Sequence, residues 1–109
     1  MPRAAEYRQA AQVLRGRGAA FSEAATAHRR HHIGEFVGPI GETHDASIDA
    51  IAARFERGGD ELHSLAELCE RRALVCDDYA SAVARWYQIP YPARLLTPFP
   101  PRPAPWVEL

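Results

Sequence analysis

Histidine is the residue type in this chain that is best suited to form a chemical site. His28, His31 and His32 fall within one helical turn, and His44 and Asp45 follow across a predicted bend. Neutral imidazoles and carboxylates are common ligands of transition metals. The spacing lacks the Glu-x-x-His pair of di-iron bundles, however. We therefore expect no metal and no other cofactor, with a metal-binding bundle as an alternative hypothesis.

The two cysteines are the next candidates. Cys69 and Cys76 are seven residues apart, which on a continuous helix separates their Cα atoms by about 10.5 Å, beyond the limit of about 7 Å for a disulfide. We expect two small buried side chains, or else a disulfide between two protomers. No nucleophile stands beside a base and no Gly-rich phosphate loop occurs, so we predict that the chain is not an enzyme.

Apolar and small residues recur at alternating steps of four and three in two segments, which is typical of helices that pack along a seam. The first seam comprises Tyr7, Ala11, Leu14, Gly18, Phe21, Ala25, His28 and His32, and the second comprises Ile48, Ala52, Phe55, Gly59, Leu62, Ala66, Cys69, Ala73, Cys76, Ala80, Val83 and Tyr87. Large residues alternate with Ala or Gly, so the helices could approach closely. The sequence predicts an all-α antiparallel helical hairpin.

A glycine-rich segment separates the two seams. Residues 34–41 contain three Gly and one Pro, which disfavour a continuous helix. The two helices and the bend between them are predicted at about residues 3–34, 45–88 and 35–44.

Two features of the second helix need explanation. Thr43 or Asp45 can cap its start, and Pro90 can end it. Gly58 and Gly59 each cost about 1 kcal/mol relative to Ala inside a helix. They therefore either allow a close approach of the first helix or break the second helix in two.

The second helix is predicted to extend beyond the end of the first. A turn near residue 41 ends the first helix opposite about residue 79, and a second apolar stripe lies beside the main seam. A lone hairpin cannot cover both surfaces. We therefore expect a four-helix bundle, formed as a homodimer or as a heterodimer with a related hairpin. The partner-binding residues predicted on the stripe are Leu65, Leu68, Val75, Tyr79 and Trp86.

Residues 89–109 hold seven of the nine prolines and are predicted to form an extended tail, partly in polyproline II conformation. The alternative to a partner on the second stripe is that this tail folds back over it. Phe99 and Trp106 are the anchors expected in that case.

The charge balance argues against some classes of partner. Thirteen basic residues, all Arg, and fourteen acidic residues are interspersed, for a net charge of -1, which disfavours nucleic-acid binding. No apolar run of about 18 residues occurs, and the first residues lack the apolar stretch of a signal peptide. We expect a soluble chain without membrane insertion. The absence of Lys and Asn is typical of a GC-rich genome such as that of an actinobacterium.

Two long helices in about a hundred residues, with an aromatic-x-Gly tripeptide at the bend, resemble the ESX-type Trp-x-Gly family of actinobacterial type VII secretion substrates, and more loosely the EspC-like secretion-associated proteins. The tripeptide here is Phe36-Val37-Gly38. The resemblance implies a dimeric four-helix bundle in which Phe36 and Gly38 help to bind the partner. A Tyr-x-x-x-Asp/Glu export signal follows in the family; here Tyr79 stands at the corresponding distance, but Val83 replaces the acid.

The resemblance covers residues 1–88 and implies a protein that is secreted without a Sec signal peptide by a type VII system, or serves one, through protein–protein pairing. The missing acid implies a heterodimer in which the other chain carries the export signal. The alternatives are a cytoplasmic partner-binding module, such as a small chaperone or an immunity-like protein, and the metal-binding bundle.

Overall fold

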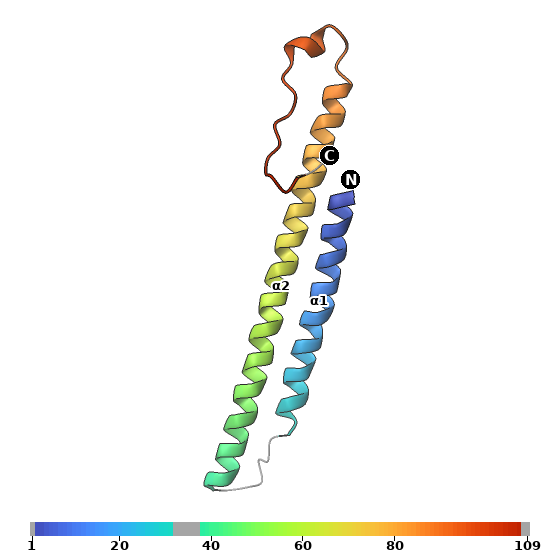
Figure 1. Ribbon diagram of the computed structural model, residues 1–109. Helices are drawn as coiled ribbons and strands as arrows, with labels where there is room; N and C mark the ends of the chain where they lie inside the picture. The colour runs from blue at the N-terminus through green and yellow to red at the C-terminus, as the bar shows by residue number, and fades with distance from the viewer. Residues whose placement is uncertain (1, 32–37, 108–109) are drawn as a thin grey trace. The chain divides into compact units, whose positions relative to one another are not determined.

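The computed structural model describes residues 2–31 and 38–107. Helix α1 spans Pro2–Arg29, helix α2 spans Pro39–Tyr87, and a short 3-10 helix, η1, spans Ala93–Leu96 (Figure 1). These two described ranges contain no strand. The predicted all-α class and helical hairpin are confirmed.

The first helix ends earlier than predicted. It stops at Arg29 instead of residue 34, and the next two amides bond to carbonyls only three residues back, with His31 N at 3.0 Å from His28 O. This tighter bonding is typical of a helix C-terminus, where the last carbonyls lack partners. Residues 32–34 of the predicted helix lie outside the described residues.

The second helix begins six residues earlier than predicted, at Pro39. Proline is tolerated at a first helical position because the amide it lacks would have no partner in the helix. Gly38 precedes it with a φ of 140°, a conformation that favours glycine. The expected cap at Thr43 or Asp45 is wrong, because both residues lie inside the helix. The Thr43 hydroxyl donates to Pro39 O at 2.8 Å.

Helix α2 runs without interruption through Gly58 and Gly59, so the alternative of a broken helix is wrong. A Cβ atom on Gly59 would lie 3.1 Å from Gly18 O, which is tight. The close approach expected at the small seam positions is therefore confirmed.

The chain packs as two units. Met1–Ala11 with Glu67–Leu109 is here called the tail-covered unit, and Gln12–Ala66 the open unit. In each unit α1 and α2 run antiparallel; Arg8 pairs with Asp77 in the first and Arg29 with Glu56 in the second.

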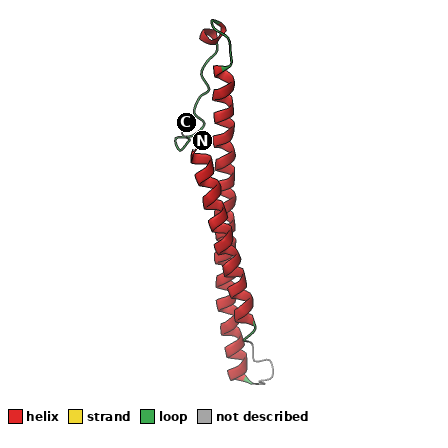
Figure 2. Ribbon diagram, turned by 90° about the vertical axis from the view of Figure 1, so that its right-hand side faces the viewer, coloured by secondary structure: helices red, strands yellow, loops and turns green. Residues whose placement is uncertain are grey.

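The core of the tail-covered unit includes residues from both helices and from the tail. Figures 1 and 2 show the segment after α2 turning back and running beside that helix. The buried cluster comprises Ala4, Ala73, Cys76, Tyr79, Val83 and Val107, with Tyr7, Val75, Ala104 and Trp106 packed against it.

The open unit has a core of smaller residues. Its buried positions are Gly18, Ala25, Gly41, Ile48, Ala52, Gly59 and Ala66. Ile48 is the only large side chain in that set. The seam of the open unit is therefore narrow, and it buries little apolar area.

Candidate interaction surface

The described histidines near the bend do not assemble a metal site. His28 and His31 have ring centroids 6.3 Å apart, and His44 Nε2 lies 3.3 Å from His31 O, a backbone partner. Within residues 2–31 and 38–107, no group of three His, Cys, Asp or Glu side chains could hold a metal ion. His32, the remaining member of the predicted cluster, lies outside the described residues.

The two thiols differ in their surroundings. Cys76 is fully buried in the core of the tail-covered unit, and burial raises the pKa of its thiol. Cys69 is half-buried, and both cysteines are free. A raised pKa keeps a thiol protonated and therefore unreactive. Cys76 accordingly has the environment of a packing residue.

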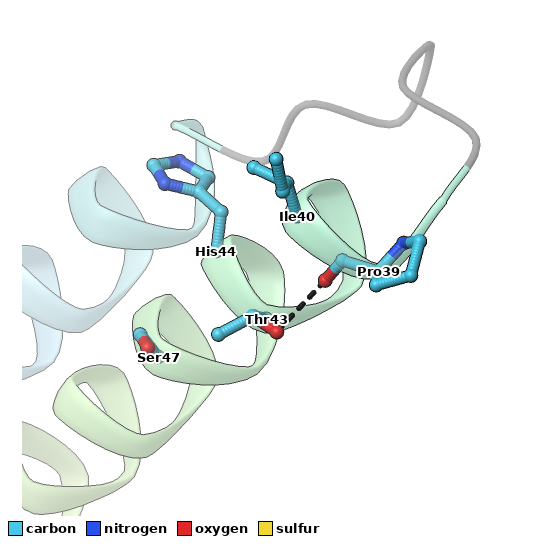
Figure 3. Close-up of a pocket in the computed structure, with 5 residues that line it drawn as sticks. All are labelled: Pro39, Ile40, Thr43, His44 and Ser47. Atoms are coloured by element: carbon cyan, nitrogen blue, oxygen red, sulfur yellow. Dashed lines mark hydrogen bonds between the residues drawn. The ribbon is translucent and has the colours of Figure 1, made fainter.

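A shallow pocket of about 410 Å³ lies at the start of α2 (Figure 3). It is lined by Pro39, Ile40, Thr43, His44 and Ser47. His44 is its one titratable residue, and the side chain of Ile40 is exposed beside it. This lining offers an apolar contact surface and no paired groups for catalysis.

The predicted partner-binding residues fall into two groups. Leu65 and Leu68 on α2 are 49% and 37% exposed. Val75, Tyr79 and Trp86 are covered within the tail-covered unit. Phe36 lies outside the described residues, and Gly38 directly precedes α2.

The tail covers the end of α2, where the sequence pattern predicts a partner-binding surface. Trp86 Nε1 donates to Thr97 O at 3.0 Å, and the Trp86 and Phe99 rings are 5.1 Å apart. Tyr79 and Trp86, which were predicted to bind a partner, are thus in contact with the tail, as in the alternative of a folded-back tail.

The end of the tail contacts both helices. The Trp106 ring lies 5.9 Å from that of Tyr7, and Arg72 stacks over Trp106 at 4.8 Å. Val107 is fully buried. Phe99 and Trp106, the two anchors expected for a folded-back tail, are thus confirmed as contact residues.

The open unit carries an apolar groove that the sequence reasoning missed. The groove has a volume of about 340 Å³ and is lined by Phe21, Ile51, Arg54 and Phe55. Phe21 and Phe55 meet edge to face at 5.9 Å, and the Phe21 ring also covers Gly58. Phe21 and Ile51 remain exposed. The sequence signal that could have predicted this groove is the alternation of large and small residues along the seam. Where the small residues form the helix contact, the large residues lie at its edge.

No described helix is both long enough and apolar enough to cross a membrane. Comparisons with protein-family models, curated proteins and solved structures find no match for this chain.

Proposed function

We propose that the chain acts by pairing with a second, related helical hairpin, and that the open unit provides the pairing surface. One observation carries this proposal. The seam of the open unit buries mainly Gly and Ala, whereas Phe21, Ile51 and Leu65 remain at least 39% exposed. Phe21 and Ile51 line one apolar groove, and Leu65 is exposed further along the helix that carries Ile51. Exposed large apolar side chains are typical of a protein–protein interface.

The energetics favour such a partner. Full burial of a Leu, Ile or Phe side chain contributes about 1.5–3 kcal/mol, and small domains have a free energy of unfolding of only about 5–15 kcal/mol. A two-helix unit with a core of Gly and Ala gains little from that core. A second hairpin packed on Phe21, Ile51 and Leu65 completes a four-helix layer and recovers the missing apolar burial.

We further propose that this pairing serves a type VII secretion system of the ESX type. Gly38, the glycine of the aromatic-x-Gly tripeptide, has a φ that favours glycine and directly precedes α2. Tyr79 and Val83 are 6% and 8% exposed under the tail, so they offer no accessible tyrosine-based signal. The low exposure of Tyr79 and Val83 supports a heterodimer whose other chain carries the export signal.

The pairing is tested by light scattering on the full chain at micromolar concentration, alone and mixed with any hairpin chain encoded beside it. We expect a 1:1 complex with such a chain. The Ile51→Glu/Leu65→Glu variant should abolish the complex, because two charges would be buried without partners. Val13→Ser should retain it, since Val13 is exposed but does not line the groove. A chain that remains monomeric in every mixture contradicts the proposal.

The role in secretion has a separate test. The tagged chain and its partner are produced in an actinobacterial host, with and without the ATPase of the type VII system. We expect both chains in the culture medium only when the ATPase is present. If the pair forms but stays inside the cell, the chain is a cytoplasmic binding module and the secretion proposal is wrong.

A further inference from the structure

A second exposed apolar surface lies where the chain leaves α2. Tyr91, Leu95 and Leu96 are 75%, 71% and 89% exposed, and Tyr87 and Phe99 beside them are exposed as well. These five residues are here called the tip. All belong to the tail-covered unit, so the tip is separate from the pairing surface proposed above.

The tip lies in a basic part of an otherwise balanced chain. Residues 79–107 contain three arginines and no acidic residue, although the whole chain has a net charge of -1. Arg85 and Arg102 are exposed, and neither has an ion-pair partner within residues 2–31 and 38–107. The segment that carries the tip therefore holds two exposed arginines without an ion-pair partner among the described residues, and the first acidic residue after it is Glu108.

The third arginine holds the tip in place. Arg94 Nη2 donates to Tyr87 O at 2.7 Å, and Arg94 Nε donates to Ile89 O at 3.2 Å. The same guanidinium stacks over the Trp86 ring at 5.4 Å. These contacts fasten η1 to the end of α2, so Leu95 and Leu96 are presented from a supported turn.

We propose that the tip binds the surface of an anionic lipid bilayer. Leucine and tyrosine side chains favour the boundary between headgroups and acyl chains, and arginines nearby gain from negative headgroups. The missing acidic residues favour a uniformly negative surface over a protein groove, which would present mixed charge. The binding is peripheral, with Leu95 and Leu96 at the acyl boundary and Arg85 and Arg102 on the headgroups.

The test is flotation of the full chain with vesicles of phosphatidylcholine, with or without about one third phosphatidylglycerol. We expect binding to the anionic vesicles, about tenfold weaker binding to the neutral ones, and weakening with added salt. Leu95→Ser/Leu96→Ser should reduce anionic binding by about tenfold or more. Arg102→Gln should reduce it by about fivefold, the equivalent of one arginine near the surface.

Leu74→Ser is the matched control, because Leu74 is an exposed leucine of the same unit outside the tip. It should bind like the parent chain, and circular dichroism should show equal helix content in all variants. No binding to anionic vesicles overturns the proposal. So does binding that soluble polyglutamate competes away and that the double leucine variant leaves unchanged, since the ligand would then be an acidic peptide.

Discussion

Both units are built from α1 and α2, but their cores are packed differently. In the tail-covered unit the core holds Tyr79, Val83 and Val107, and the tail provides the third packing element. In the open unit the core is built from residues such as Ala52 and Gly59, and Ile51 remains 41% exposed. This difference indicates where the partner proposed above would pack, which is beside the unit that lacks a covering segment.

In the tail-covered unit a proline-rich segment takes the place that a third helix would occupy. Proline has no amide hydrogen, so an extended tail that is rich in it leaves fewer backbone donors without partners. Its restricted φ also lowers the entropy lost on ordering. The tail needs only a few bonds, such as Trp86 Nε1 to Thr97 O, and its remaining contacts are apolar and aromatic.

The largest expected effect comes from removing the anchors of the tail. Trp106→Ala/Val107→Ala should lower the free energy of unfolding by about 3 kcal/mol, because two apolar side chains leave a packed site. Hydrogen exchange should accelerate in residues 72–87 and stay unchanged in residues 45–60. Ile40→Ala, at an exposed position, is the control and should change neither. Equal loss of protection in both ranges would show that the units are not independent.

The next effect belongs to the seam of the open unit. Gly59→Leu should lower the free energy of unfolding by about 1–3 kcal/mol, because the new side chain meets the Gly18 backbone, which cannot move cheaply. Gly16→Ala should instead raise it by about 0.5–1 kcal/mol, since the added Cβ meets nothing and Ala favours a helix. Urea denaturation measures both. A tolerated leucine at residue 59 would mean that the helices are not closely packed there.

The helices could be predicted from the sequence because a heptad pattern is a local signal. Periodicity placed Ala11, Gly18 and Ala52 on the seam, and all three are buried. The ends were less accurate. The start of α2 was placed too late because Pro39 and Gly41 were interpreted as breakers, although proline fits a first turn and Gly41 is buried inside the helix.

The apolar pattern of α2 does not show whether a partner or the tail covers this surface. An apolar stripe shows that Tyr79 and Trp86 need a cover, but the same stripe suits a foreign helix or a folded-back segment. That choice depends on contacts between residues far apart in the chain, such as Tyr7 with Trp106. The groove at Phe21 was missed for a related reason, because the seam pattern does not show how far a large residue projects beyond a narrow seam.

A smaller effect tests how tightly the tail closes its unit. Burial raises the pKa of Cys76. The thiol therefore ionises at a lower pH in the unfolded chain than in the folded chain. Its contribution to stability is complete below the ordinary thiol pKa of 9.0 and is lost as pH rises above it. At pH 8, alkylation should modify the half-buried Cys69 first. Trp106→Ala should accelerate the alkylation of Cys76. If Cys69 and Cys76 of the parent chain are alkylated at equal rates, the tail does not shield Cys76.

The smallest expected effect concerns the ion pair on the surface of the open unit. Arg29 donates a hydrogen bond to Glu56 and thereby lowers the pKa of that carboxyl. The pair therefore stabilises the fold above the ordinary pKa of 4.5, and this contribution disappears as pH falls through the lowered value. Solvent screens an exposed pair, so Glu56→Gln should reduce the melting temperature only slightly at pH 7. The difference from the parent chain should shrink once the pH lies below 4.5. A large loss at pH 7 would instead mean that this pair holds the narrow seam together, and that the open unit depends on its charges more than on its glycine and alanine contacts.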